Sequence, residues 1–396
     1  MTERLYYRDP GLLDFTASIV EQIASEGKFR TRLDRSAFYP TSGGQLFDLG
    51  LLNGIPVIEV LESEDGEVWH VSDQPIGIAG ETISGAVDRA RRSKNRQQHT
   101  AQHILSAMFI KLYGFETVSV HLGEEYGAIE LSTPNLEPNQ LVRVERESNA
   151  ILQENIPVQI IFASRDEVSR LPLRKAPDRT GEIRVIQIGE LDCSACGGTH
   201  CSFTAEVGLI KLTGLEKIRN RVQVKFLAGA QALQDYSVRF EVTDTLSRSL
   251  TCAVSDLPGI VATLGNESKA ARKEVGALQK ELLPIRAATL AASVTPHNGR
   301  NLVTFEAGTM DPGISGQLAG LVAENIKGIA VTISDGRFIM AVAAESGLHA
   351  GELAKQLGPK CNLRGGGSNK LAQLGGAEAS RLNEYKDALL GLIPHA

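Results

Sequence analysis

Long hydrophobic runs are missing from this chain of 396 residues. No stretch approaches the roughly 20 apolar residues that a membrane helix needs, and the first residues, MTERLYYRDP, lack the apolar core of a signal peptide. Cysteine is scarce too: there are five, an odd number, and Cys193, Cys196 and Cys201 are clustered. This pattern argues against a disulfide framework and favours a metal in a reducing compartment. We therefore expect a cytoplasmic protein that makes no contact with a membrane.

An excess of positive charge is also absent, since the formal net charge of −6 argues against indiscriminate binding of nucleic acid. Basic residues are nevertheless concentrated in two segments, Arg89–Arg96 and Lys211–Lys225. If a helix begins near Ala90, Arg92 and Arg96 share a face with the histidines described next. A charge run is often only a solvated helix face. Two such segments beside one site favour a substrate that carries phosphate.

Two pairs of metal-binding residue types have the same spacing. HTAQH places His99 and His103 four residues apart, and CGGTH does the same for Cys196 and His200. The histidine pair lies in a proline-free stretch, Ala90–Tyr113, whose apolar residues recur at helical spacing, so both rings share one helix face. The second pair lies in a glycine-rich loop after a strand-like run. Because Zn²⁺ prefers imidazole and thiolate donors, we predict one zinc ion per chain, held by these four residues.

Alternatives to this assignment remain open within the sequence. Cys193 and Cys196 form a competing CxxC pair, and Cys201 directly follows the second motif. A metalloprotease is excluded, because that motif needs Glu after the first histidine and this chain has Thr100. A structural zinc site has four protein ligands, whereas a catalytic one keeps a position open.

The pattern of strands, helices and turns predicts four segments. Residues 1–86 contain short strands separated by Gly, Asn and Asp turns, which is typical of a small antiparallel β-barrel. Residues 87–229 mix helices with a largely antiparallel sheet and would form an α+β core. Residues 230–293 are predicted to be helical, with Asn266 as a helix N-cap and a kink or break at Pro284. Residues 294–396 alternate strands and helices and would form a small α/β domain.

A glycine-rich loop is predicted within this last segment. It runs from Arg364 through Gly365, Gly366 and Gly367 to Lys370. Backbone N–H groups of such a loop could cradle a phosphate, although the spacing matches no P-loop.

Several motifs together resemble the AlaX family of free-standing alanyl-tRNA editing proteins, in its long form. The resemblance rests on HTAQHILSA, VHLGEEYGAIEL and DCSACGGTH, and on AFYPTSGGQ and GAVDRARR before them. NLRGGGSNKLAQLGG is similar to the DHH-associated domain that ends both this long form and the alanyl-tRNA synthetases. The resemblance covers nearly the whole chain and is weakest over residues 230–290.

The resemblance implies an α+β multidomain protein. Its parts would be an N-terminal β-barrel, a zinc-bearing editing core, a helical connection and a C-terminal α/β DHH-associated domain that helps to hold tRNA. The zinc ligands of the family match His99, His103, Cys196 and His200, and its glycine motif, near the aminoacyl end of the substrate, matches Gly43 and Gly44. Gln102 stands where the family often has Thr or Met, and is a candidate for positioning the ester or a water molecule. His121 lies in the strand that lines the family's pocket. It is either an active-site residue or an ordinary sheet histidine.

The implied function is trans-editing of mischarged tRNA(Ala). Serine differs from alanine by one hydroxyl, which a small pocket rejects only about 10²-fold. A second site that requires the hydroxyl can hydrolyse Ser-tRNA(Ala) selectively, and Gly-tRNA(Ala) would need an argument from size. Zinc would either supply a nucleophilic water or hold the substrate.

Other functions fit parts of the same pattern. One is a non-catalytic tRNA-binding protein with a structural zinc. Another is a synthetase fragment, disfavoured because the chain begins at the barrel and leaves no length for an ATP-dependent domain. A third is hydrolysis of some other ester or amide. The helical and C-terminal regions could also support a homodimer.

Overall fold

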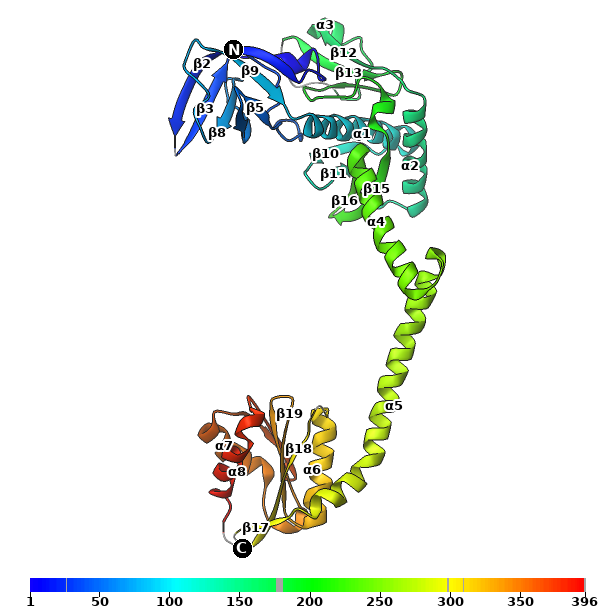
Figure 1. Ribbon diagram of the computed structural model, residues 1–396. Helices are drawn as coiled ribbons and strands as arrows, with labels where there is room; N and C mark the ends of the chain where they lie inside the picture. Colours follow the sequence, from blue (N-terminus) through cyan, green and yellow to red (C-terminus); the bar gives the residue numbers. More distant parts are fainter. Residues whose placement is uncertain (26, 176–180, 298, 309, 395–396) are drawn as a thin grey trace. The chain divides into compact units, whose positions relative to one another are not determined.

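The computed structural model describes residues 1–25, 27–175, 181–297, 299–308 and 310–394. The chain divides into two compact units, Met1–Leu246 and Ser247–Ala396 (Figure 1). Both units combine helices with sheets, so the predicted α+β multidomain class is confirmed at this level. The finer division into four segments stays a prediction. Among the described helices, none has the length and apolar character required to cross a membrane.

The first unit begins with a nearly closed, barrel-like sheet of seven strands in the order β6-β5-β9-β2-β3-β8-β7. Its strands are β2 (Asp14–Ser25), β3 (Lys28–Leu33), β5 (Gly50–Leu52), β6 (Ile55–Val57), β7 (Glu59–Glu62), β8 (Val68–Ser72) and β9 (Thr82–Val87). Short β1 (Glu3–Arg4) pairs with β4 (Arg35–Ser36). Alternate residues such as Ile19, Leu33, Val60 and Ile83 point inward and form the barrel core.

A buried histidine in β8 makes the stability of this barrel depend on pH. His70 is fully buried, and its ring nitrogens contact the Ser36 hydroxyl at 2.7 Å and the Thr31 carbonyl at 3.1 Å. Burial lowers the pKa of His70 from 6.5 to about 4. As the pH falls from 6.5 to about 4, His70 binds a proton in the unfolded chain but not in the folded chain. The folding stability that is present above pH 6.5 is therefore lost over this range. We expect His70 to account for a loss of about 3 kcal/mol.

Urea unfolding at pH 7 and pH 4.5 tests this expectation, with fluorescence of Trp69 as the probe. Trp69 is the chain's single tryptophan and adjoins His70 in β8. The wild type should lose more stability between the two pH values than His70→Gln, which cannot titrate. Equal losses would contradict the assignment.

The second part of this unit is built on helix α1 (Arg89–Tyr113). The Asp88 carboxylate caps its first turn by accepting from the Arg91 backbone N–H at 2.7 Å, and Gly114 ends it in the left-handed conformation. Helix α1 and α2 (Pro138–Gln153) pack on an antiparallel sheet in the order β10-β11-β16-β15. Its strands are β10 (Thr117–Leu122), β11 (Gly127–Leu131), β15 (Ile210–Ile218) and β16 (Arg221–Ala228). A second sheet contains β12 (Val158–Ala163), β13 (Ile183–Ile188) and β14 (Asp192–Ala195).

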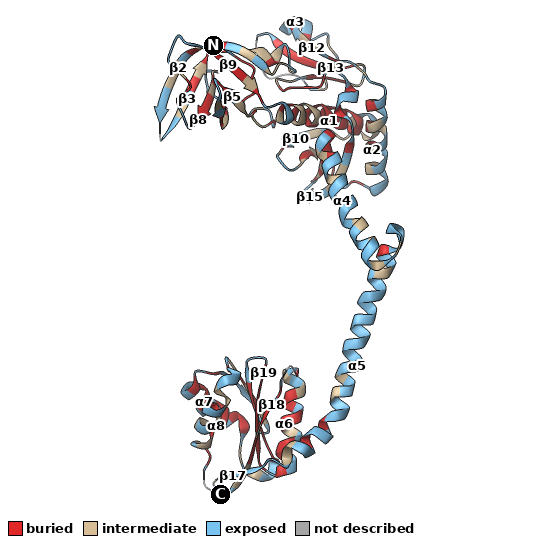
Figure 2. Ribbon diagram, viewed as in Figure 1, coloured by how far each residue is buried: buried red, intermediate tan, exposed pale blue. Residues whose placement is uncertain are grey.

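Two helices follow, α4 (Gly229–Leu250) and α5 (Leu257–Ala291). They confirm a helical region, but the predicted N-cap was wrong: helix α5 begins at Leu257, so Asn266 lies inside it. The helix also continues through Pro284, so of the predicted kink or break at this proline the break is wrong and the kink stays a prediction. Most of α5 is exposed, while Leu283 and Ala287 near its end pack against α6 (Pro312–Ile326) (Figure 2).

The second unit carries a sheet in the order β17-β18-β19-β20-β22-β21. Helix α6 covers one face, and α7 (Ala350–Cys361) and α8 (Leu382–Leu390) cover the other (Figure 1). Its strands are β17 (Thr295–His297), β18 (Arg300–Glu306), β19 (Ile329–Ser334), β20 (Arg337–Val342), β21 (Arg364–Gly367) and β22 (Leu371–Gly375).

The glycine run at residues 364–367 is therefore an edge strand and not a loop, which corrects the sequence prediction. Glycine is required because β21 and β22 approach closely. A Cβ at Gly365 would lie 2.2 Å from the Gln373 carbonyl oxygen, and one at Gly367 would lie 2.2 Å from that of Leu371.

Candidate metal centre and adjoining cavity

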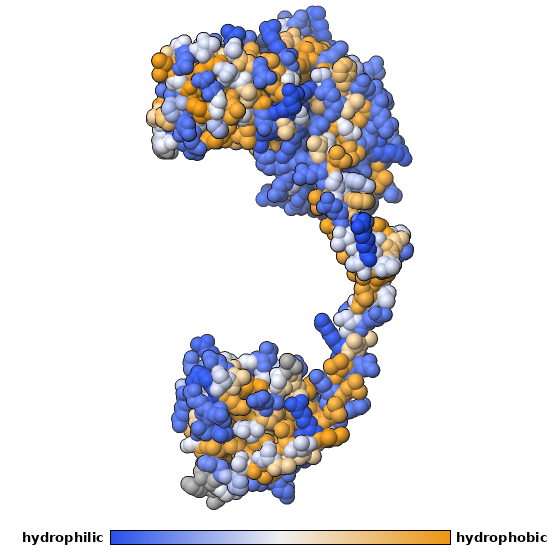
Figure 3. Space-filling model, in the orientation of Figure 1, coloured by the Kyte–Doolittle hydropathy of each residue, from blue (hydrophilic) through white to orange (hydrophobic). Residues whose placement is uncertain are grey.

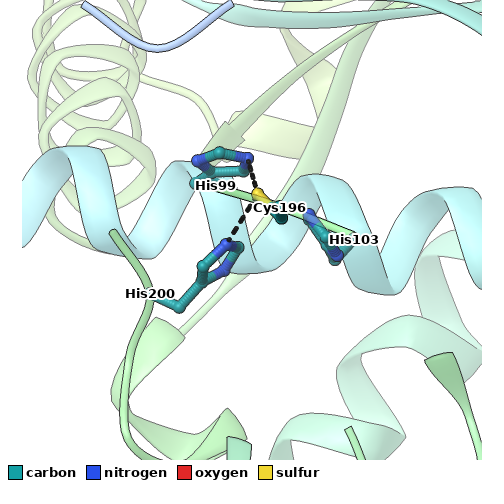
Figure 4. A group of neighbouring side chains, drawn as sticks. All are labelled: His99, His103, Cys196 and His200. Carbon is teal, nitrogen blue, oxygen red and sulfur yellow. Dashed lines mark hydrogen bonds between the residues drawn. The ribbon is translucent and has the colours of Figure 1, made fainter. Parts of the chain in front are cut away.

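Four side chains from two distant segments meet in the first unit. His99 and His103 project from α1, and Cys196 and His200 come from the loop after β14 (Figure 4). One donor atom from each lies within 4.8 Å of the others. The Cys196 Sγ is 3.4 Å from Nε2 of both His99 and His200. Since Zn–S is about 2.3 Å and Zn–N about 2.0 Å, tetrahedral ligand atoms lie roughly 3.5 Å apart, so this donor set fits zinc.

His99 is held by a residue of the barrel. The Thr199 backbone N–H donates to Gln45 Oε1 at 3.1 Å, so that oxygen is an acceptor, and the His99 Nδ1 at 2.8 Å must carry the proton that it accepts. Nε2 of His99 is therefore left with its lone pair facing Cys196. A Cβ at Gly198 would lie 2.1 Å from the His99 ring, so the loop can pass here only as glycine.

The other two imidazoles have outer oxygen partners as well. His103 Nδ1 donates to the Asp192 carboxylate at 2.7 Å, and His200 Nδ1 lies 3.3 Å from the Thr100 hydroxyl. In each ring Nδ1 is engaged outside the cluster, which leaves Nε2 for its centre. Such outer partners fix the tautomer and orientation of metal-bound histidines.

The electrostatics of the cluster suit a cation. Burial would raise the pKa of the Cys196 thiol, but the adjacent His99 and His200 hold it well below its usual range. Burial and His99 together lower the pKa of His200. For His103, burial is outweighed by Asp192 and Cys196, which raise its pKa to about 9. The cluster thus presents a thiolate, the form of cysteine that binds metals.

A cavity of about 930 Å³ adjoins the cluster. Its described wall includes His99, His103 and Cys196, and extends along Tyr39 and Tyr7 toward the N-terminus. Both glycines of the predicted motif lie here or beside it. Gly43 lines the cavity, and Gly44, at φ +85°, sits where a Cβ would meet the Val120 carbonyl oxygen at 2.9 Å.

The other two candidate catalytic residues, Gln102 and His121, differ in their position relative to the cavity. Gln102 lines the cavity, is buried, and donates to the Ser106 hydroxyl at 2.9 Å. His121 is exposed and lies beside Tyr126, whereas its neighbour Val120 lines the cavity. Successive side chains of a strand point to opposite faces, so His121 points away from the wall that Val120 lines, and of the two alternatives this position matches an ordinary sheet histidine.

The basic residues of α1 also differ from the prediction. Arg92 is 1% exposed, and its guanidinium is paired with the fully buried Asp48 at 2.6 Å. It also donates to the carbonyls of Pro10 and Ala37. Arg92 thus joins the barrel to α1 and is not accessible to a phosphate, which corrects its assignment to tRNA binding. Arg96 is partly exposed, pairs with Glu206 at 3.0 Å, and donates to the His200 carbonyl at 2.7 Å.

The predicted phosphate cradle of the second unit is on the surface. Arg364 and the three glycines of β21 are exposed, as is Lys370, which pairs with Glu324 at 3.2 Å. Sequence reasoning missed Gln45 and Asp192 as partners of the cluster. Gln45 follows Gly43 and Gly44 in a motif that was noted only for its glycines. The sequence signal therefore pointed to these neighbours and not to Gln45 itself.

Several known proteins are similar to this chain in sequence. Residues 183–223, which contain Cys196 and His200, match the family model "Threonyl and Alanyl tRNA synthetase second additional domain". The chain is 30% identical to the alanyl-tRNA editing protein AlaX-L of Pyrococcus horikoshii, over all of this chain and 99% of that protein. It is 29% identical to the alanyl-tRNA editing protein Aarsd1 of Mus musculus, over 97% and 96% of the two chains. The alanine–tRNA ligase of Methanopyrus kandleri is 30% identical, and the match covers 99% of this chain but only 44% of the ligase.

Proposed function

The chain belongs to the family of alanyl-tRNA editing proteins that includes AlaX-L, and from this premise we propose that it is a trans-editing aminoacyl-tRNA hydrolase. It would cleave the ester that joins a wrong amino acid to tRNA(Ala), with Ser-tRNA(Ala) as the main substrate and Gly-tRNA(Ala) as a second. The observation that carries the proposal is the His/Cys cluster, which opens into a cavity in a chain similar to an editing protein from end to end.

His99, His103, Cys196 and His200 would hold one zinc ion in this scheme. Bound zinc would supply Lewis-acid polarisation of the substrate or of water. The residues of the chain would do the rest. Gln45 and Asp192 keep His99 and His103 in one tautomer and orientation, Thr100 contacts the ring of His200, and the loop that carries Gly43 and Gly44 forms part of the cavity wall, near the aminoacyl end.

Selection of serine would depend on unpaired polar groups. Gln102 lines the cavity with His99 and His103, and because its Nε2 donates to Ser106, its Oε1 is the atom that could accept from a substrate hydroxyl. A correct alanyl group would leave that oxygen without this donor, at a cost that can exceed what a size filter achieves.

A comparison of deacylation rates on Ser-tRNA(Ala), Gly-tRNA(Ala) and Ala-tRNA(Ala) tests the proposal. Ser-tRNA(Ala) should be hydrolysed at least about 100-fold faster than the correctly charged tRNA, because discrimination by hydrogen bonding reaches this level. Gln102→Leu should reduce the ratio of the rate on Ser-tRNA(Ala) to the rate on Ala-tRNA(Ala). No hydrolysis of any of the three would refute trans-editing.

A second candidate function is supported by one observation. The cluster offers four protein donors, the number found in closed, structural zinc sites. The protein would then bind tRNA without catalysis, and binding with no hydrolysis is the result that would favour it.

Contact with tRNA outside the active site would come from the second unit. Arg364, the glycines of β21 and Lys370 form an exposed basic edge that is open to a phosphate backbone. Arg96 is the other candidate, through the part of its guanidinium that solvent reaches.

Helix α5 would mediate a homodimer. Its apolar residues with a 3.5-residue repeat are 47–67% exposed and share one face of the helix, which we call the apolar stripe. They are Val261, Leu264, Val275, Leu278, Leu282 and Ile285. Figure 3 shows patches of apolar surface along the helical segment, separated by polar surface. Glu267 and Glu281 each precede an arginine, Arg272 and Arg286, by five residues along the flanks of this stripe. This spacing pairs opposite charges between two parallel copies and like charges between antiparallel ones, so the favoured partner is a second copy in parallel.

Replacement of Leu278 by glutamate should convert the dimer to a monomer, because a charge would enter the apolar seam. Sedimentation equilibrium checks this, with Lys273→Glu as the control, since residue 273 lies on the opposite side of α5 from the stripe. A wild type that stays monomeric at all concentrations would contradict the proposed dimer.

A further inference from the structure

The cavity beside the cluster extends well past the cluster itself, and its far wall is built from rings and guanidinium groups. An aminoacyl group occupies only a small part of about 930 Å³. Tyr7, Arg184 and Phe162 all line this part of the cavity. Their chemistry, aromatic faces beside fixed positive charges, is that of surfaces that bind unpaired nucleotides.

These residues follow one another outward from the cluster. A Cβ at Gly197 would lie 3.4 Å from the Tyr7 hydroxyl, so Tyr7 adjoins the loop that carries Cys196. The Arg184 guanidinium is 5.5 Å from the centre of the Tyr7 ring and donates to the Cys196 carbonyl at 2.6 Å. In the sheet, Phe162 of β12 lies directly opposite Arg184 of β13.

Phe162 ends the row with an exposed ring. The residue is 38% exposed although burying an aromatic side chain is favourable, and the Arg8 guanidinium lies 5.8 Å from its ring centre. Within the described part of the chain, no ion pair with a carboxylate includes Arg8 or Arg184, although Arg184 donates to the carbonyls of Tyr7, Cys196 and Gly198. Among the described residues, no carboxylate therefore neutralises either guanidinium.

We propose that Phe162, with Arg8 and Arg184, forms a stacking subsite for an unpaired nucleotide near the 3′ end of the substrate tRNA. The inference rests on the proposed function and deepens it by placing the nucleotides that precede the ester. The ring stacks on a base, and the exposed Arg8 guanidinium faces the charged backbone. Arg184 is 6% exposed and held by the carbonyls of Tyr7, Cys196 and Gly198, so it adds positive charge to the wall without reaching a phosphate itself. An apolar protein partner would match the ring but not the two cations beside it, so a nucleic acid is the better fit.

The test uses the full-length, metal-loaded protein and uncharged tRNA(Ala) in which 2-aminopurine replaces the terminal adenine. Stacking quenches the fluorescence of this base. The wild type should quench it, and Phe162→Ala should weaken binding about tenfold or more, within the range of stacking on one aromatic side chain. In deacylation of Ser-tRNA(Ala), Phe162→Ala should raise KM with little change in kcat. Phe162→Trp, which keeps an aromatic ring, should return KM to the wild-type value.

Phe203→Ala is the matched control. Phe203 is similarly exposed, at 44%, and is not among the described residues that line the cavity. Arg8→Gln provides a second variant that does not alter the ring, and it should weaken binding and reduce its salt dependence. Zinc content and circular dichroism verify that each variant is folded.

The outcomes separate this subsite from the proposed function. Quenching and KM that do not change in Phe162→Ala would overturn the subsite even if the protein deacylates Ser-tRNA(Ala). Quenching that depends on Phe162 in a protein with no deacylase activity would support the subsite and refute the hydrolase. An equal effect of Phe203→Ala on quenching and KM would also overturn the subsite, because the effect would then not be specific to the ring of Phe162.

Discussion

Replacing Cys196 with alanine should remove the bound zinc and slow deacylation of Ser-tRNA(Ala) by more than about 100-fold. Cys196 is the only thiolate of the described cluster, and its Sγ contacts two of the three imidazoles at 3.4 Å. Loss of a mere outer partner of a metal ligand costs about 10- to 100-fold, so loss of a ligand should cost more. Elemental analysis of zinc per chain and single-turnover deacylation measure the two effects. A chelator should reproduce the loss in the wild type.

Cys193 and Cys201 supply the matched controls, since the sequence left both open as ligands. In the structure the side chains of both pack in hydrophobic clusters, and the described metal-binding group contains neither. Cys193→Ala and Cys201→Ala should therefore keep their zinc and most of their activity. If Cys193→Ala lost zinc while Cys196→Ala kept it, the assignment would be wrong. Full activity in zinc-free Cys196→Ala would leave the metal without a catalytic role.

Replacing Asp48 with alanine should destabilise the first unit by about 3–5 kcal/mol, the cost of leaving one charge of a buried pair without its partner. Arg92 and Asp48 are 1% and 0% exposed, and their closest atoms are 2.6 Å apart. The Asp48 carboxylate also accepts from the Tyr39 backbone N–H at 2.8 Å, so the loop that carries Gln45 should loosen with it. Urea unfolding followed by Trp69 fluorescence, with zinc affinity measured in parallel, tests both consequences.

The double variant Asp48→Leu, Arg92→Met separates charge from packing. If the cost of Asp48→Ala comes from an uncompensated guanidinium, removing both charges should recover most of the lost stability. A double variant as unstable as Asp48→Ala would instead assign the cost to an interaction that both variants lack, the hydrogen bond that Asp48 accepts from the Tyr39 backbone N–H.

The cluster of candidate ligands could be predicted because each pair is local. His99 and His103 share a helix face at a four-residue spacing, and Cys196 and His200 are held by one short glycine loop. The helix bounds were predictable for the same reason: Gly114 is a left-handed cap wherever the helix packs. Such features depend on neighbours within one or two turns.

The failures share the opposite property. Whether His121 or Val120 faces the cavity depends on the register of β10 in its sheet, and one residue reverses the answer. Arg92 and Arg96 belong to the same basic segment of the sequence. Arg92 is nevertheless buried, because it pairs with Asp48, a carboxylate 44 residues earlier in the chain. The glycines after Arg364 indicated a loop because glycine has a low strand propensity. They are in fact needed in β21, where the backbone approaches β22 closely, and this partner strand does not enter into a local propensity.

The sequence by itself thus determined the two pairs of candidate donors, the helical regions and, through its motifs, the family. Only the tertiary structure decided how the donors are held and what surrounds them. Gln45 comes from the barrel to orient His99, and Asp192 comes from β14 to orient His103, across 54 and 89 residues. Spacing encodes contacts that recur along one helix or loop, whereas these contacts exist only when separate elements pack together.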